Sequence, residues 1–127
     1  MLSDSDRKSL ELLEQFLRSE HPLFPDHFHM GSFTCWLRTL KDRFSISACG
    51  STACALGFLP MADPERFQWS LSGALIKNGR KTDWVDALDS IAVRDWEDLF
   101  ESVNYPPPRP ITPLRVAYRI KTYLQTV

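Results

Sequence analysis

Apolar residues recur every three or four positions along several stretches of this chain, which is the spacing of an amphipathic helix. The first stretch predicts a helix from Ser3 to about Glu20, because Ser3 with Asp6 three residues later forms a capping box with Asp in place of Glu. The same spacing predicts helices over 33–44, 82–91, 94–102 and 112–127. The apolar face of the first helix comprises Leu10, Leu12, Leu13, Phe16 and Leu17.

Proline, glycine and asparagine mark the breaks between these helices. Pro22 and Pro25 keep residues 21–29 out of a helix, and the prolines between 106 and 110 form a stiff extended connector. Residues 68–77 predict a small β-hairpin, and the Asn-Gly pair at 78–79 predicts a turn. The last helix should bury Val116, Ala117, Ile120, Tyr123, Leu124 and Val127.

The segment from Cys49 to Gly57 is rich in small residues and predicts a short helix that Pro60 ends. Because Ala53 and Ala55 carry little side-chain volume, this helix can pack closely against its neighbours, and we expect it at the centre of the core. The pattern as a whole predicts a mainly α protein. We expect a compact bundle of about five to six short helices, with one small β-hairpin near residues 68–77.

The composition fits a single domain spanning residues 1–127, since 43% hydrophobic residues are enough to fill one core. Charge is nearly balanced, with 15 Lys and Arg against 16 Asp and Glu, which disfavours a general nucleic-acid or membrane-surface binder. The acidic residues of the first helix interrupt any apolar span, so we expect a cytoplasmic protein, in the host cytoplasm if a phage encodes it. Three cysteines, an odd number, favour reduced thiols, and we expect no cofactor.

Several short motifs occur in a particular order along the chain, from residue 28 to about residue 124. They are Phe28-His29-Met30, the segment Cys49 to Gly57, Leu99-Phe100 and Thr112-Pro113. In this respect the chain resembles a loose family of short phage and prophage proteins. That family has no assigned activity, so the resemblance implies only a phage-type accessory protein that binds and modulates a host protein. An inhibitor of a nucleic-acid-handling or defence enzyme, such as a CRISPR effector, is one such protein.

Acidic residues dominate between positions 83 and 101, where Arg94 is the only basic residue and the local net charge is −6. One interpretation is that these acids are the solvated faces of two amphipathic helices. The other is an acidic surface that docks on a basic surface of a host protein, with Trp84 or Trp96 as an aromatic anchor. The candidate binding residues are Asp83, Trp84, Asp86, Asp89, Asp95, Trp96, Glu97, Asp98 and Glu101.

A cysteine near a helix start suggests an alternative function. The helix amides would stabilise a Cys49 thiolate, which could act with His27 or His29 in a small thiol-dependent enzyme. The same residues with Cys54 could hold zinc, although on a continuous helix Cys49 and Cys54 would point about 140° apart. Packed thiols and a solvated histidine loop are the simpler interpretation.

The basic residues Arg115, Arg119 and Lys121 could contact phosphates, but without interleaved exposed aromatics they do not predict direct nucleic-acid binding. The sequence therefore favours a non-enzymatic protein that binds a host protein with a basic surface through its acidic helices. The thiol enzyme or zinc protein centred on Cys49 remains the alternative.

Overall fold

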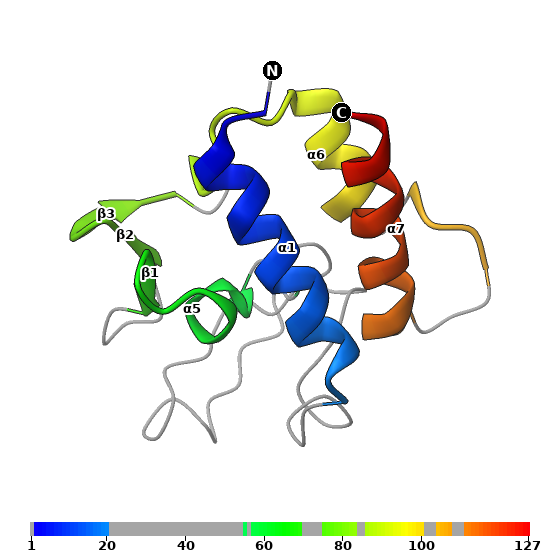
Figure 1. Cartoon of the computed structure of the whole chain (residues 1–127), viewed down its shortest axis with the longest axis horizontal. Coiled ribbons are helices and arrows are strands. Elements are labelled where there is room, and N and C mark those ends of the chain that lie inside the picture. Colours follow the sequence, from blue (N-terminus) through cyan, green and yellow to red (C-terminus); the bar gives the residue numbers. More distant parts are fainter. Residues whose placement is uncertain are drawn as a thin grey trace.

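The computed structural model describes residues 2–20, 55, 57–69, 75–83, 86–100, 104–107 and 111–127 (Figure 1). The helices in this part of the chain are α1 (Asp4–Arg18), α5 (Leu59–Ala62), α6 (Val93–Phe100) and α7 (Pro113–Thr126). Three short strands, β1 (Phe67–Trp69), β2 (Leu75–Lys77) and β3 (Arg80–Thr82), form an antiparallel sheet in the order β1-β2-β3. The protein is mainly helical, as expected. However, its described residues form four helices beside a sheet, and not a bundle of five to six helices.

Helix α1 begins as the sequence predicts. The Ser3 side chain caps it by accepting a hydrogen bond from the Asp6 amide at 3.1 Å, and Leu10, Leu13 and Leu17 are buried. The reciprocal half of the predicted capping box is replaced, because the Ser3 amide donates to the Ser90 hydroxyl at 2.9 Å. This contact leaves the Asp6 carboxylate free to bind partners elsewhere in the fold.

Helix α7 lies antiparallel to α1, and the two ends of the chain come close together (Figure 1). The Arg7 guanidinium of α1 donates to the carbonyl of Leu124 at 3.3 Å and to that of Val127 at 2.8 Å. It thereby satisfies carbonyls that a helix end leaves without partners. The predicted core face is confirmed for Val116, Ala117 and Ile120, but Val127 is 50% exposed because the helix ends there.

The predicted hairpin is confirmed, and a third strand extends it. Phe67 pairs with Lys77, and Trp69 pairs with Leu75. Asn78 and Gly79 connect β2 to β3 with φ angles of 51° and 81°, the left-handed pair that a two-residue hairpin turn requires. The turn that the sequence predicts after the hairpin therefore joins two strands of the sheet.

The helix predicted over 82–91 is wrong. Thr82 ends β3 and its hydroxyl donates to the Arg80 carbonyl at 3.1 Å, so it caps no helix. Residues 86–91 form consecutive turns, and the next helix begins only at Val93. Ala87, Leu88 and Ile91 are buried, which gives these turns the apolar spacing of a helix without its backbone.

Only two positions of the segment 49–57 lie in the described part of the chain. Ala55 and Gly57 are both buried in helical conformation, in line with the expected close packing. Pro60 does not end the helical path, because it lies in the first turn of α5, where its missing N–H costs nothing. The cysteines of this segment lie outside the described residues.

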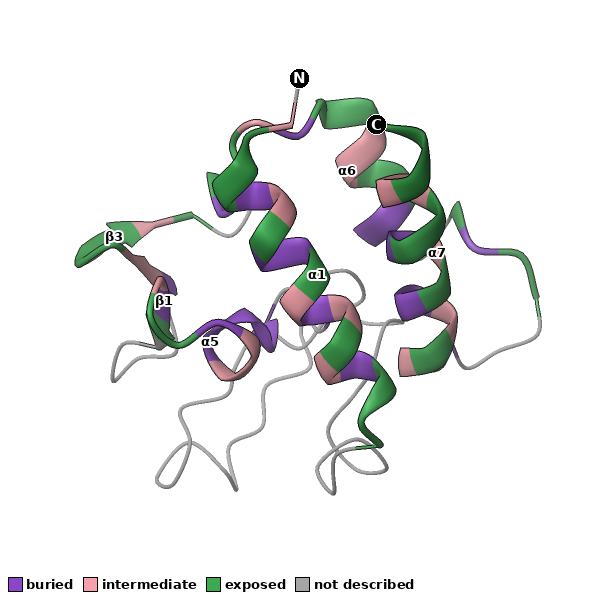
Figure 2. Cartoon of the chain, viewed as in Figure 1, coloured by how far each residue is buried: buried purple, intermediate pink, exposed green. Residues whose placement is uncertain are grey.

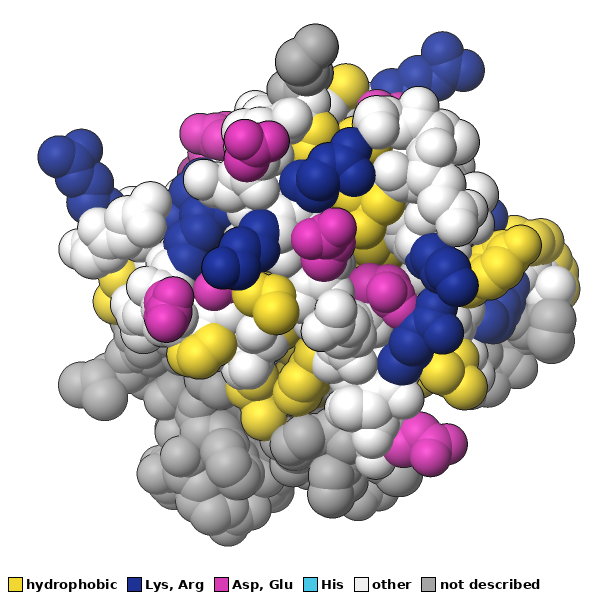
Figure 3. Space-filling model, viewed as in Figure 1, with side chains coloured by type: hydrophobic (Ala, Val, Ile, Leu, Met, Phe, Trp, Pro, Cys, Tyr) yellow, Lys and Arg dark blue, Asp and Glu magenta, His cyan; other side chains and the backbone are white. Residues whose placement is uncertain are grey.

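The core lies between α1, α7, α5 and the sheet (Figure 2). Three phenylalanines, Phe58, Phe67 and Phe100, are its largest buried side chains and come from widely separated elements. Burying a side chain of this size contributes about 2 kcal/mol. On the face shown in Figure 3, acidic and basic side chains are interspersed over α1, and no patch of a single sign forms there.

Candidate functional site

The turn at residues 86–91 presents two acidic residues to solvent. Ala87, Leu88 and Ile91 anchor the turn in the core, while Asp86 and Asp89 are exposed. The amides of Asp86 and Ile91 donate to the carbonyls of Asp83 and Leu88, respectively. The alternation of apolar and acidic residues therefore holds the carboxylates outside a fixed loop.

A buried polar network fastens this turn to α1 and to the start of the sheet. The Ser90 amide donates to the Asp6 carboxylate at 2.9 Å, and the Ser90 hydroxyl also donates to it. The Arg66 guanidinium donates to Asp6 at 2.7 Å and to the Ser9 hydroxyl at 2.9 Å, and Ser9 donates to Asp63 at 2.7 Å. We call this set the Asp6 network; its members are Ser3, Asp6, Ser9, Asp63, Arg66 and Ser90.

Asp6 is fully buried, and its partners keep it charged. Burial by itself would raise the pKa of this carboxyl, but the hydrogen bonds from Ser90 and the contact with the Arg66 guanidinium outweigh burial and lower the pKa. A buried charge that is paired and hydrogen-bonded in this way is stable, whereas one that loses a partner is costly. The Asp6 network is therefore a structural element that sets the position of the acidic turn.

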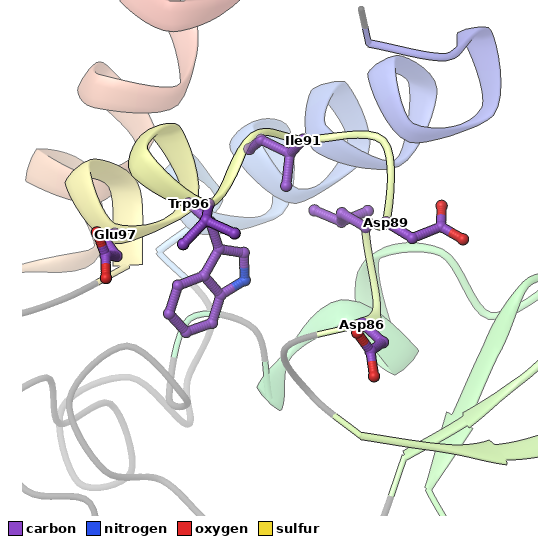
Figure 4. A pocket seen from close by; sticks show the side chains of 7 residues that line it. Asp86, Asp89, Ile91, Trp96 and Glu97 are labelled. Atoms are coloured by element: carbon purple, nitrogen blue, oxygen red, sulfur yellow. The ribbon is translucent and has the colours of Figure 1, made fainter.

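Beside this turn lies a pocket of about 320 Å³ (Figure 4). The Trp96 indole extends from α6 toward the turn that carries Asp86, and Glu97 lies on the helix at the other side of the indole. We call this the Trp96 pocket; its lining residues are Asp86, Leu88, Asp89, Ile91, Val93, Trp96 and Glu97. Val93 at its edge is 75% exposed, so the pocket combines carboxylates with apolar surface.

The Trp96 side chain is partly buried and packs edge-on against Phe100, with ring centroids 5.8 Å apart. Its indole nitrogen is buried and has no hydrogen-bond acceptor in the part of the chain that the structure describes. A buried donor without an acceptor costs about 1–3 kcal/mol. Within the described residues, packing is therefore what holds the indole in place.

The carboxylates of the Trp96 pocket differ in their pairing. Asp89 lies 3.7 Å from the Lys77 ammonium, but its side chain is 72% exposed. Within the described residues, neither Asp86 nor Glu97 forms an ion pair. The Lys77 ammonium donates to the main-chain carbonyl of Asp86 at 3.4 Å, but within the described residues the side-chain carboxylates of Asp86 and Glu97 have no ion-pair partner.

The other acidic residues of α6 face a different neighbour. Asp95 and Asp98 line a second pocket, of about 340 Å³, between α6 and α7, with Tyr118, Arg119 and Tyr123. At about 100° per residue, these positions lie across the helix from Val93 and Glu97. The acidic stretch is therefore divided, and only part of it faces the Trp96 pocket.

Asp95 also has a neighbour on α7. Burial and the nearby Asp95 carboxylate both raise the pKa of Tyr123, while Arg7 opposes them. Asp95 and Tyr123 line the pocket between α6 and α7 together. Like Asp6, Asp95 lies next to another element of the fold, whereas Asp86 is exposed on the turn.

The basic residues of α7 are also engaged in the fold. The Arg119 guanidinium stacks over the Tyr105 ring at 4.0 Å and donates to the carbonyls of Asp98 and Asn104, both at 2.7 Å. Arg115 donates to the Pro106 carbonyl. Burial raises the pKa of Tyr105, which keeps its hydroxyl neutral as it donates to the Leu99 carbonyl at 2.7 Å. These arginines fasten the segment after α6 onto α7.

An exposed aromatic residue does lie among these basic residues. Tyr118 is 69% exposed and lines a third pocket, of about 330 Å³, with Leu114, Arg115 and Arg119. The sequence does not predict that this ring is exposed. The guanidinium donors nearby nevertheless already bind backbone carbonyls.

Several predicted site residues lie outside the described residues. These are Trp84 and Glu101 of the acidic set, and His27, His29, Cys49 and Cys54 of the thiol or zinc alternative. Within the described ranges, no group of His, Cys, Asp and Glu is arranged to hold a metal ion. None of the helices described is long and apolar enough to cross a membrane.

The Asp6 network is not predicted by the sequence. The pattern predicts only a capping role for Asp6, and Ser90 falls within the helix predicted over 82–91. The available signal was Asp6 itself, which falls on the same helical face as Leu10, Leu13 and Leu17. An acidic residue on a core-facing stripe indicates a buried partner, but the sequence does not say which residue that is.

Comparison of the chain with protein-family models, curated proteins and solved structures finds no match. The Trp96 pocket and the Asp6 network are therefore the features of the structure that bear on function.

Proposed function

We propose that this chain is a non-enzymatic, phage-type accessory protein that binds a host protein with a basic surface and modulates it. The binding surface is the acidic face around the Trp96 pocket, formed by Asp86, Asp89, Glu97 and the partly buried Trp96. By imitating nucleic acid, such a face would inhibit a host enzyme that handles nucleic acid or acts in defence.

The observation that carries this proposal is the pairing of the carboxylates. The buried acid Asp6 is paired with Arg66 in the fold. Within the described chain, the side-chain carboxylates of Asp86 and Glu97 form no ion pair, although both line a pocket beside an aromatic ring. Acidic groups without partners attract a complementary basic surface and speed its association.

An anchored aromatic residue supports the same function. Tryptophan is enriched among the residues that contribute most to protein–protein binding, especially where surrounding groups exclude water. Trp96 is partly buried and lines the pocket together with Ile91 and Val93. The acids would then attract the partner, and the indole with its apolar neighbours would hold it.

The test is affinity capture from a bacterial host lysate with three versions of the protein. The test variant carries Asp86→Lys, Asp89→Lys and Glu97→Lys. The control carries the same charge change at exposed acids outside the acidic stretch, as Glu11→Lys, Glu20→Lys and Glu65→Lys. A partner captured by the wild type and the control, and lost with the test variant, would support the proposal. Equal capture by all three would refute the acidic face.

A further inference from the structure

We infer that two copies of this chain form a twofold-symmetric dimer through the outer face of α7, where the Tyr118 rings meet at the symmetry axis and Arg115 of each copy faces Asp98 of the other. This inference goes beyond the proposed function, because the surface lies across α6 from the Trp96 pocket. A second copy of the chain occupies this face, and the host protein binds the acidic face.

The outer face of α7 carries apolar side chains that the fold leaves uncovered. Leu114 is 53% exposed and Tyr118 is 69% exposed. The two residues are four positions apart, so their side chains are neighbours along the helix surface. Val93 and Val127 are the other large hydrophobic residues that are exposed in the described part of the chain. Exposed apolar side chains that adjoin one another are typical of an interaction site, whereas single ones are not.

Two pockets extend this surface in opposite directions along the helix. The pocket of about 330 Å³ reaches Leu114 toward the start of α7, the pocket of about 340 Å³ reaches Thr122 toward its end, and Tyr118 lines both. At 1.5 Å per residue, Leu114 and Thr122 lie about 6 Å to either side of Tyr118. The segment after α6 runs beside α7 and borders the first pocket with Pro106 (Figure 1). We call the two pockets together the α7 groove; on α7 it comprises Leu114, Arg115, Tyr118, Arg119, Thr122 and Tyr123.

The two ends of the α7 groove differ in charge. The charged residues among the described ones that line the end near Leu114 are Arg115 and Arg119, both basic. The other end has Asp95 and Asp98 beside the shared Arg119. Both arginines donate to main-chain carbonyls, which leaves their positive charge in place. One end of the groove is therefore positive, and the other has an excess of negative charge.

The order of these charges selects both the partner and its orientation. A twofold axis that crosses α7 at Tyr118 sets the second α7 antiparallel to the first. The positive end of each groove then lies over the negative end of the other, so the opposite charges meet twice. A parallel pair would bring like charges together, which is unfavourable. The groove is thus complementary to itself, which is the property that a twofold-symmetric dimer requires.

The size of the α7 groove indicates a weak dimer. Each copy contributes two exposed apolar side chains, which places the contact at the small end of specific interfaces. Offset stacking of the two Tyr118 rings adds to the apolar contact, while each exposed ion pair contributes little by itself. We therefore expect a dissociation constant on the order of 0.1 mM.

Sedimentation equilibrium of the full chain, from about 10 µM to about 1 mM, tests this expectation on both sides of that constant. The average mass should rise with concentration from 14.6 kDa toward twice that value. Tyr118→Ser removes the ring at the axis and should weaken the dimer by about tenfold. Val93→Ser, which removes an exposed apolar side chain outside the groove, is the matched control and should leave self-association unchanged.

A charge exchange tests the antiparallel orientation. Arg115→Glu places two acids together at each contact, and Asp98→Arg places two bases together, so each variant alone should associate about tenfold more weakly than the wild type. An equimolar mixture of the two restores opposite charges at both contacts and should form the mixed dimer. The control mixture, Lys8→Glu with Glu65→Arg, changes the same charges outside the groove and should behave as the wild type. A folding defect in either variant would not be repaired by mixing, so recovery reports the contact itself.

Three results would overturn the inference. One is a protein that stays monomeric up to about 1 mM, about ten times the expected constant. In that case, Arg115 and Tyr118 NMR signals that shift with inorganic phosphate would assign the groove to an anion. The second is a dimer that Tyr118→Ser does not weaken, which would place the contact on another face. The third is a mixture of Arg115→Glu and Asp98→Arg that associates no better than either variant alone.

Discussion

The Asp6 network and the Trp96 pocket are neighbours that use similar polar groups for opposite purposes. They meet in the turn at residues 86–91, where Ser90 belongs to the network and Asp86 and Asp89 line the pocket. In the network the Asp6 carboxylate accepts from Ser90 and Arg66 and is fully buried. In the pocket the carboxylates are exposed, and the indole N–H has no acceptor in the described chain. The comparison teaches that pairing, more than residue type, separates a structural charge from one available to a ligand.

The largest expected effect comes from breaking the network at its centre. Asp6→Ala should lower the free energy of unfolding by about 3 kcal/mol or more, because Arg66 would be left partly buried without its carboxylate. Asp4→Ala, two residues earlier and exposed, is the matched control and should have a much smaller effect. Denaturant unfolding measures both, and similar losses in the two variants would contradict a structural role specific to Asp6.

Arg66, the charged partner of Asp6, can be replaced in the Asp6→Ala variant. Asp6→Ala with Arg66→Met replaces the pair by apolar groups and should recover part of the loss of the single variant. The recovery, measured as an interaction energy in a double-mutant cycle, reports the coupling between the two residues. Strictly additive losses would show that they do not act as a pair.

Strong acid should weaken the Asp6 network. The pKa of Asp6 is lowered from its ordinary value of 3.8, so the folded state binds this proton less readily than the unfolded state. Its contribution to stability is complete above that ordinary value, and it is lost as the pH falls through the lower pKa of the folded protein. Unfolding measured from about pH 6 down to about pH 2 should show this loss in the wild type, and a shallower fall in Asp6→Asn. Parallel curves would exclude Asp6 as the titrating group.

A smaller effect is expected at the edge of the network. Ser9→Ala removes the hydroxyl that donates to Asp63 and accepts from Arg66, and it should cost about 1–2 kcal/mol. Ser5→Ala, on the exposed side of the same helix, is the control and should be neutral or slightly stabilising. Thermal unfolding distinguishes the two, and a neutral Ser9→Ala would show that water replaces its hydrogen bonds.

The smallest effects on stability are expected in the Trp96 pocket. Asp86→Asn and Glu97→Gln should not shift the unfolding midpoint measurably, because surface substitutions away from partners rarely do. Trp96→Phe should change the unfolding free energy by less than about 1 kcal/mol, since the loss of ring volume is offset by removal of an unpaired donor. A large destabilisation by Asp86→Asn or Glu97→Gln would mean that the pocket, like the network, is structural.

Much of the local structure could be predicted from short-range patterns. Ser3 and Thr112 start α1 and α7 as expected, and Asn78-Gly79 forms the turn between β2 and β3. Each of these features depends on contacts within a few residues, which the sequence displays directly. The prediction of a helix over 82–91 was wrong because pairing of β3 with β2 competes with helix formation. This pairing depends on a neighbouring strand and cannot be recognised from the residues of 82–91 themselves.

The candidate site was predictable in composition but not in arrangement. The sequence identified the acidic stretch and Trp96, yet it treated all the acids as one surface. In the structure α6 directs Asp95 and Asp98 toward α7, whereas Glu97 faces the Trp96 pocket. Which of them keeps a free carboxylate depends on neighbours such as Tyr123, more than twenty residues away.

The sequence by itself determined that the chain is mainly helical, where its capped helices begin, and that its middle-to-late region is strongly acidic. These properties follow from the period of apolar residues, from capping side chains and from local charge. Only the tertiary structure decided that Asp6 is buried against Arg66 and Ser90 while Asp86 is left open beside Trp96. The physical reason is that burial and pairing of a polar group depend on residues brought together from distant parts of the chain, and those contacts form only when the chain folds.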